Sequence, residues 1–101
     1  MIDVTVKFYG ILRTNVVKEA SRQFTLDPCT VEDLINELIQ HYGEELKAKL
    51  VDPETNQLTN RLILFVNGTN VKTLQGPKTV LKEGDLVAIF PPSGGGKIDY
   101  S

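Results

Sequence analysis

Apolar and polar residues alternate at the beginning of the chain. Over residues 2–9 the apolar side chains recur at every second position, which predicts a half-buried strand that ends at Gly10. A second strand is predicted over residues 22–26, before Asp27-Pro28 breaks the pattern. The two strands and the residues between them are interpreted as a hairpin with a wide connection.

The following segment changes to helical periodicity. Thr30 is predicted as the N-cap with Asp33 at the N3 position, although Asp is shorter than the Glu or Gln of a capping box. Gly43 stands where a left-handed C-cap is expected. The apolar residues recur at helical spacing: Val31, Leu34, Ile35, Leu38, Ile39 and Tyr42. Together these features predict one amphipathic helix over residues 31–42.

Shorter elements follow the helix. A second short helix is predicted over residues 44–50, a loop over 52–56 and a strand over 62–67. Asn67-Gly68 is the dipeptide most typical of a two-residue hairpin turn, so a return strand is expected at about residues 70–72.

The last strand is predicted over residues 86–90, between a turn at 83–85 and the dipeptide Pro91-Pro92, which cannot continue a β-ladder. The elements then run β-β-α-β-β-β with one amphipathic helix, which buries its apolar stripe only by lying across one face of a sheet. We therefore expect an α+β fold. Its mixed sheet has four to five strands, with the first and last strands as central neighbours and the second face open.

The strand patterns divide the apolar residues between the two faces of this sheet. Seven residues are predicted to point at the helix: Val4, Val6, Phe8, Leu64, Val66, Val87 and Ile89. Five are predicted to point outward: Tyr9, Ile63, Phe65, Ala88 and Phe90. An aromatic cluster on an uncovered sheet is typical of a docking surface. We therefore expect Tyr9, Phe65 and Phe90 to contact a partner, with Pro91 and Pro92 as a stiff exit beside them.

Composition excludes several classes of protein. One hundred and one residues predict a single domain, and 41% hydrophobic with 24% charged residues are typical of a soluble globular chain. A net charge of −2 provides no positive field for nucleic acid, and no apolar run is long enough to cross a membrane. The N-terminus does not resemble a signal peptide, so we expect a cytoplasmic protein.

The residues inside this domain do not predict a catalytic site. The single cysteine, Cys29, excludes a disulfide framework and a four-thiolate metal site built by this chain alone, and no other metal site is predicted. Cys29 is interpreted as a small buried hydrophobic residue, and the single histidine, His41, as a surface residue near a helix end. We therefore expect a protein that is not an enzyme in its own right.

The C-terminal residues differ from the rest of the chain. A domain is predicted over residues 1–92 and a flexible tail over 93–101, with three consecutive glycines at Gly94, Gly95 and Gly96. Glycine has no Cβ, so this segment fits a channel too narrow for other residues. Gly96 is the sixth residue after Phe90, a reach of roughly 20 Å, which is enough to enter the active site of a partner.

Several motifs in the second half resemble a known family. They are residues 64–71, 74–76 and 81–85, and the run Val87–Pro92 that leads into the glycines. These motifs strongly resemble the MoaD/ThiS family of ubiquitin-like sulfur carriers. They are closest to MoaD, the small subunit of molybdopterin synthase, whose tail after Phe-Pro-Pro ends in Gly-Gly. The resemblance implies a β-grasp fold and a C-terminal glycine that is adenylated with ATP and then converted to a thiocarboxylate.

Carried onto this chain, the family's diglycine falls on Gly95 and Gly96, Gly94 belongs to the variable pair before it, and Gly96 would carry the sulfur. The implied partners are an E1-like adenylating enzyme of the MoeB or ThiF type, which uses the ATP, and a MoaE-like large subunit that makes the dithiolene of the molybdenum cofactor. No cofactor is expected on the chain itself. Residues 97–101 depart from the family pattern, because an amide-linked Gly96 has no carboxylate to adenylate. We therefore expect cleavage after Gly96, by a metalloprotease of the JAMM type.

Two alternatives stay open. An activated terminus is also compatible with sulfur delivery to thiamine, cysteine or tRNA, or with conjugation to lysines as a ubiquitin-like modifier. The other alternative is a β-grasp interaction module whose tail is never activated.

Overall fold

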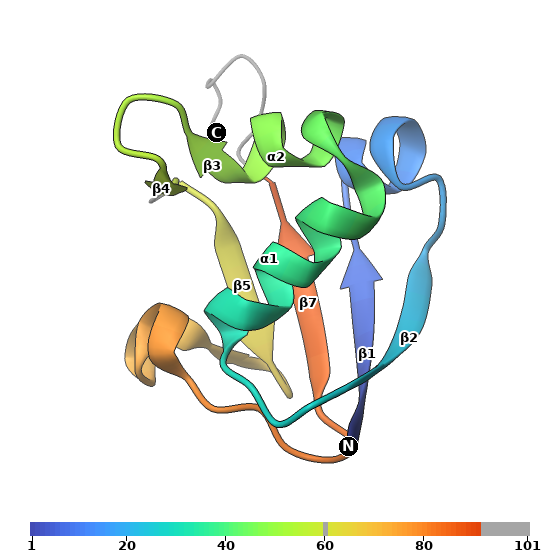
Figure 1. Ribbon diagram of the computed structural model, residues 1–101, viewed down its shortest axis with the longest axis vertical. Coiled ribbons are helices and arrows are strands. Elements are labelled where there is room, and N and C mark those ends of the chain that lie inside the picture. The colour runs from blue at the N-terminus through green and yellow to red at the C-terminus, as the bar shows by residue number, and fades with distance from the viewer. Residues whose placement is uncertain (60, 92–101) are drawn as a thin grey trace.

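The first and last strands lie side by side in the centre of a five-stranded sheet. The structure, a computed structural model, describes residues 1–59 and 61–91. Strand β1 (Ile2–Phe8) pairs in parallel with β7 (Leu86–Phe90), which confirms the predicted neighbours. The order is β2-β1-β7-β5-β6, in which β2 (Ser21–Leu26), β5 (Ile63–Val66) and β6 (Thr69–Asn70) make antiparallel pairs (Figure 1).

Helix α1 (Val31–Tyr42) crosses one face of this sheet (Figure 1). The Asp33 backbone N–H donates to Thr30 Oγ1 at 3.2 Å, and the Thr30 N–H donates to Asp33 Oδ2 at 3.0 Å. The short Asp side chain therefore completes a capping box. These two bonds satisfy donors that the first helical turn leaves without a partner.

The end of α1 differs from the prediction. Gly43 has φ of 90°, a value that L side chains rarely adopt, but its ψ of −161° lies outside the left-handed helical region. Gly43 is therefore the C-cap with a positive φ, as predicted, but the prediction that it adopts the left-handed helical conformation is wrong. The physical reason is that a second helix, α2 (Glu44–Leu50), begins at the next residue, so the chain turns sharply within Gly43.

Two elements after α2 were not predicted in this form. The expected loop over residues 52–56 is partly wrong, because β3 (Val51–Asp52) and β4 (Gln57–Leu58) pair as a small antiparallel ribbon. Strands of two residues are too short to show a period.

The connection between β1 and β2 contains one π-helical turn (Leu12–Val16), which the alternating pattern does not indicate either.

The β5–β6 hairpin forms at the predicted dipeptide. Asn67 and Gly68 have φ of 52° and 84°, the two positive values that a type I′ turn requires. The return strand is shorter and earlier than predicted, because it covers Thr69–Asn70 and a 3₁₀ turn (Val71–Thr73) follows at once. Val71 is buried in this turn, so its side chain packs into the core at the point where the chain leaves the sheet.

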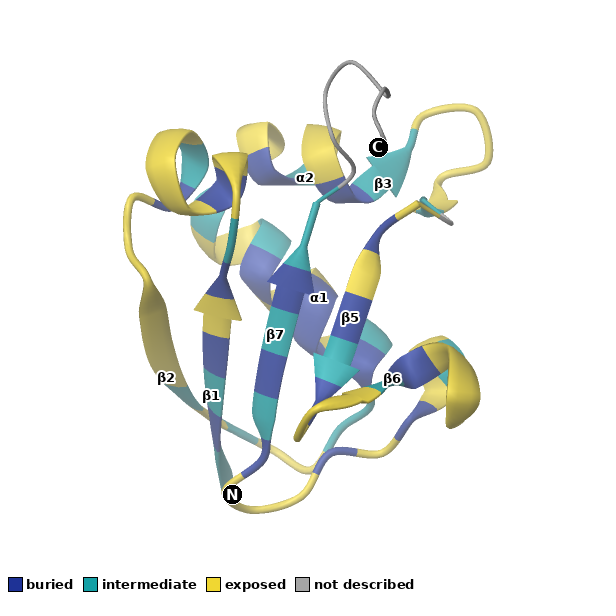
Figure 2. Ribbon diagram, turned by 180° about the vertical axis from the view of Figure 1, so that it is seen from behind, coloured by how far each residue is buried: buried dark blue, intermediate teal, exposed yellow. Residues whose placement is uncertain are grey.

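The core fills the space between α1 and the sheet. All seven residues predicted to face the helix are buried. Fully buried side chains also come from segments that the strand patterns do not cover: Leu12, Leu34, Ile35, Leu38, Leu46, Leu50 and Leu81. One helix on one side of a mixed sheet is the α+β arrangement expected from the sequence. The second face of the sheet has no helix over it among the described residues (Figure 2).

The predicted tail over residues 93–101 lies outside the described residues, as does Pro92. No helix in the described part of the chain is long and apolar enough to cross a bilayer.

Candidate functional site

The open face of the sheet carries the five residues that were predicted to point outward. Along β7 the exposure alternates, with Val87 and Ile89 buried and Leu86, Ala88 and Phe90 half-buried (Figure 2). Ile63 on β5 is more open still, with 43% of its surface exposed. The strand periods therefore assign both faces of the sheet correctly.

Tyr9, Phe65 and Phe90 form one aromatic cluster on this face. The rings of Tyr9 and Phe90 are stacked, with centroids 4.3 Å apart and planes 12° from parallel. Phe65 meets Phe90 edge to face at 5.6 Å. Strand pairing explains the cluster, because Ala88 lies opposite Phe65 and the Tyr9 backbone N–H donates to the Ile89 carbonyl at 3.2 Å. Three predicted contact residues are thus brought together from three segments of the chain.

The chain leaves the sheet next to this aromatic cluster. Pro91 follows Phe90 directly and is half-buried. Gly10 has φ of 60°, and a Cβ added there would lie 3.5 Å from Pro91 Cγ. That distance is an ordinary van der Waals contact, so glycine is needed at this position for its positive φ and not for the space beside the proline ring. Pro92, Gly94, Gly95 and Gly96, the other predicted site residues, lie outside the described residues.

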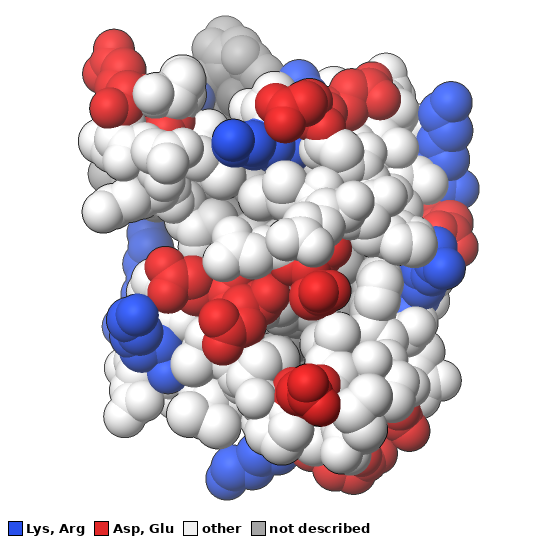
Figure 3. Space-filling view, viewed as in Figure 1, with Lys and Arg blue, Asp and Glu red and all other residues white. Residues whose placement is uncertain are grey.

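The helix side of the molecule has the opposite chemical character. Acidic side chains gather over the middle of this face (Figure 3). Asp33 and Glu37 lie on α1 and are exposed. Hydrogen bonds from Thr30 lower the pKa of Asp33 below its ordinary value, so this carboxyl stays charged at neutral pH. A partner therefore meets an apolar, aromatic surface on one side and a negative surface on the other.

His41 and Cys29 occupy ordinary positions. His41 is exposed in the last turn of α1, with Nε2 2.9 Å from an Arg22 guanidinium nitrogen, as expected of a surface residue. Cys29 is half-buried and packs against the core, so its interpretation as a small buried hydrophobic residue is confirmed only in part. Burial and the nearby carboxylates of Asp33 and Glu37 raise the pKa of the Cys29 thiol, which disfavours a reactive thiolate. Within residues 1–59 and 61–91 no three His, Cys, Asp or Glu side chains lie close enough together to hold a metal ion.

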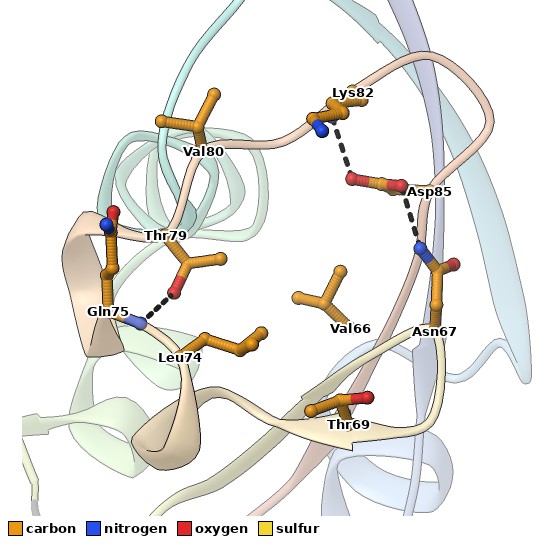
Figure 4. A pocket seen from close by; sticks show the side chains of 9 residues that line it. All are labelled: Val66, Asn67, Thr69, Leu74, Gln75, Thr79, Val80, Lys82 and Asp85. Atoms are coloured by element: carbon orange, nitrogen blue, oxygen red, sulfur yellow. Dashed lines mark hydrogen bonds between the residues drawn. The ribbon is translucent and has the colours of Figure 1, made fainter.

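A surface pocket lies at the other end of the sheet, beside the β5–β6 turn (Figure 4). Its polar groups bond to one another. Asp85 accepts from the Asn67 side chain at 2.8 Å and from the Lys82 backbone N–H at 2.7 Å. The Gln75 N–H donates to the Thr79 hydroxyl at 3.1 Å. The bond between Asn67 and Asp85 holds the β5–β6 turn to the residue before β7, so these polar groups of the pocket are already used by the fold.

Comparison with known proteins identifies the family. A family model described as the ThiS family matches residues 6–96, which is most of the chain and includes the diglycine. This chain belongs to the ThiS family.

Three relatives illustrate the range of this family. A candidate sulfur carrier protein from Archaeoglobus fulgidus is 31% identical over 79% of this chain and 89% of its own length. The solution structure of small archaeal modifier protein 1 from Methanosarcina acetivorans superposes with a TM-score of 0.80 at 27% identity, covering 95% and 98% of the two chains. A candidate subunit 1 of molybdopterin converting factor from Pyrococcus furiosus matches with a TM-score of 0.71 at 26% identity, over 92% of this chain and 100% of that one.

These relatives confirm the ubiquitin-like β-grasp fold that the sequence motifs imply. They also establish the general class of this chain, which is a small ubiquitin-like carrier or modifier of the ThiS family and is not itself a catalytic enzyme.

Proposed function

We propose that this chain is a sulfur carrier, activated at Gly96, that donates sulfur in molybdopterin biosynthesis. The observation that carries the proposal is the position of the aromatic cluster, which lies directly beside the point where the chain leaves the sheet. A partner that binds Tyr9, Phe65 and Phe90 would receive the following residues at a defined place. The glycines that follow have no side chains to obstruct a narrow active site.

The activation chemistry uses the Gly96 carboxylate. One carboxylate oxygen attacks the α-phosphorus of ATP and displaces pyrophosphate, which forms an acyl-adenylate on Gly96. A sulfur nucleophile of the hydrosulfide or persulfide class then attacks the acyl carbon, and AMP leaves with the bonding electron pair. With a persulfide, a thiol releases the terminal sulfur by disulfide exchange. The product is a thiocarboxylate, whose sulfur is nucleophilic.

This chemistry requires a free carboxylate on Gly96. In the sequence Gly96 is joined to Lys97 by an amide bond, so residues 97–101 must be removed first. Hydrolysis by a metalloprotease of the JAMM type would add water across this bond and release a five-residue peptide.

The proposed partners are an E1-like adenylating enzyme of the MoeB or ThiF type, which consumes the ATP, and a MoaE-like large subunit. The aromatic cluster has the composition that dominates binding energy at protein interfaces, where a few buried aromatic side chains carry most of the affinity. Acidic side chains gather over the middle of the helix side, so the cationic groups that bind a phosphorylated pterin would come from the large subunit.

Intact-mass spectrometry tests this proposal. A chain ending at Gly96, incubated with an E1-like enzyme, ATP and a sulfide donor, is expected to gain the mass of one oxygen-for-sulfur exchange. The full chain is expected to stay unchanged under the same conditions. Reconstitution with a MoaE-like subunit and the pterin precursor should then form the dithiolene and return the carrier to its carboxylate. Absence of both the adenylate and the thiocarboxylate from the 1–96 chain would contradict the proposal.

Two variants separate an effect on partner binding from an effect on folding. Ile63→Thr removes apolar surface from the open face and keeps a β-branched residue, so it should weaken partner binding with little effect on stability. Thr25→Ser, on the open side of the edge strand β2, is the matched control and should leave partner binding unchanged.

Conjugation to lysine side chains is a second candidate, favoured by the similarity to small archaeal modifier protein 1. It predicts the same adenylate, followed by an isopeptide bond between Gly96 and a lysine of another protein. Peptide mapping of cell proteins for a lysine that carries the C-terminal residues of this chain distinguishes the two candidates.

A further inference from the structure

Lys7 is a charged residue beside the aromatic cluster on the open face of the sheet. It is exposed and lies on β1 opposite Ala88 of β7. Val6 and Phe8, its neighbours in the chain, are buried on the helix side. Tyr9 of the aromatic cluster follows two positions after Lys7, so the two residues share one side of the chain and lie roughly 7 Å apart. A partner that covers the aromatic cluster therefore also meets Lys7.

The Lys7 ammonium group forms no ion pair within the described part of the chain. The two ion pairs found there join Arg22 to Glu19 and Lys78 to Glu32. Lys7 takes part in neither of them, and its side chain is exposed. Its charge is therefore hydrated in the free chain and is available to a partner.

The acidic residues of the neighbouring segments are engaged elsewhere. Glu19 precedes the edge strand β2, but its carboxylate lies on the helix side, where it accepts from the Tyr42 hydroxyl of α1 at 3.3 Å. Asp3 lies on the same side of β1 as Lys7, but four positions earlier, which is roughly 13 Å away. Asp3 also accepts from the Thr25 hydroxyl at 2.7 Å. A carboxylate that pairs with Lys7 would therefore come from another protein.

The segments around the aromatic cluster and the chain exit are positive, although the whole chain has a net charge of −2. They are residues 4–18, 61–66 and 86–91, and their charged residues are all basic: Lys7, Arg13, Lys18 and Arg61. Acidic side chains gather instead over the middle of the helix side (Figure 3). Because the two sides differ in charge, a partner with an acidic binding surface would be oriented toward the chain exit before contact.

The free energy of burying an ammonium group limits which partners can cover the aromatic cluster. A purely apolar surface would remove water from Lys7 without replacing its hydrogen bonds, which is strongly unfavourable. A carboxylate would replace the lost water with a charge-assisted hydrogen bond, whereas a lysine or arginine at the same place would be repelled. Lys7 therefore distinguishes between partners that offer equally apolar pockets.

We infer that the partner of this chain binds the aromatic cluster in an apolar pocket with an Asp or Glu carboxylate at its rim, and that this carboxylate pairs with Lys7. The inference rests on the proposed function, in which an E1-like adenylating enzyme is the first such partner. Lys7 is then a specificity-determining residue of the docking face and takes no part in the chemistry at Gly96.

Isothermal titration calorimetry of the full chain with the E1-like adenylating enzyme, in the absence of ATP, tests this inference. Lys7→Glu should raise the Kd about tenfold or more, because a repulsive pair replaces an attractive one, and Lys7→Arg should keep it within about threefold of the wild-type value. Raising the salt concentration should weaken binding of the wild-type chain more than binding of Lys7→Gln.

The matched control is Lys82→Glu, which makes the same change of charge at an exposed residue at the other end of the sheet. Its Kd should stay within about threefold of the wild-type value. The Tm of Lys7→Glu should be close to that of the wild-type chain, because the Lys7 side chain is exposed and makes no ion pair with the described residues.

Each contrary outcome overturns the inference. An unchanged Kd for Lys7→Glu would show that no carboxylate faces Lys7, and equal losses for Lys7→Glu and Lys82→Glu would show a response to net charge alone. Binding of a single-stranded oligonucleotide that Lys7→Glu abolishes would assign the charge to nucleic acid. A wild-type chain that does not bind the enzyme contradicts this inference and the proposed function together. Binding that depends on Lys7, with a 1–96 chain that cannot be adenylated, contradicts the proposed function alone.

Discussion

Phe90→Ala is the substitution that tests the geometry of the aromatic cluster most directly. Phe90 stacks on Tyr9 at 4.3 Å and meets Phe65 at 5.6 Å, so removing its ring breaks both contacts at once. The neighbouring Ile89 points to the other face and is fully buried, which makes Ile89→Ala a matched comparison on the same strand.

The expected effect follows from these contacts. Each aromatic pair contributes about 0.5–1.5 kcal/mol beyond the area it buries, so Phe90→Ala should lower the free energy of unfolding by about 1–3 kcal/mol. For a domain of this size that loss corresponds to a fall in Tm of about 5–20 °C. Ile89→Ala leaves a cavity in the core and should cost more, about 2–5 kcal/mol.

Urea denaturation of the full chain, followed by far-UV circular dichroism, measures these values. A double-mutant cycle of Phe90→Ala with Tyr9→Leu isolates the stacked pair, and a coupling energy of about 0.5–1.5 kcal/mol is expected. A coupling energy of zero would refute the stacked arrangement. A loss for Phe90→Ala above about 3 kcal/mol would exceed what the two aromatic contacts explain and would show that Phe90 belongs to the core and not to the open face.

Four further measurements test other parts of the structure. Thr30→Ala removes the hydroxyl that caps α1 and should cost about 1 kcal/mol in thermal unfolding; no change would mean that the cap contributes nothing. Because the pKa of Asp33 is lowered, its carboxylate stabilises the fold above its ordinary pKa of 3.8, and this stability is lost as the pH falls below that value. In Asp33→Asn the urea midpoint should therefore fall less steeply as the pH is lowered. Asp85→Ala leaves the Asn67 amide without its acceptor and should destabilise by about 1–3 kcal/mol, whereas an unchanged urea midpoint would argue against this bond. Cys29, with its raised pKa, should react with iodoacetamide at pH 8 more slowly than an unstructured peptide thiol, and an equal or faster rate would contradict its surroundings.

Much of the fold could be predicted because its long elements have clear periods. The strand over 86–90 and the helix over 31–42 have the predicted bounds, and the strand before Gly10 matches within a residue. Their side chains alternate between a buried and an exposed environment at the period of the backbone itself. The same alternation placed Phe65 and Phe90 on the open face correctly.

Other features could not be predicted because they depend on contacts between distant segments. The ribbon of Val51–Asp52 with Gln57–Leu58 has strands too short for a period, and Leu12 is buried from a turn that no pattern marks. The sequence points to Gly43 as a helix end but not to its ψ, which is set by the start of α2. A local sequence pattern does not specify which other elements a helix or strand packs against.

The candidate site was also predictable from the sequence only in part. The sequence alone determined that Tyr9, Phe65 and Phe90 point outward and that glycines follow the last strand, because both statements depend only on the chain's own period and composition. Only the tertiary structure decided that the three rings touch, that Pro91 lies against Gly10 and that the chain exit adjoins the aromatic cluster. The parallel pairing of β1 with β7 joins residues about eighty positions apart, and a contact of that kind is created only when the chain has folded.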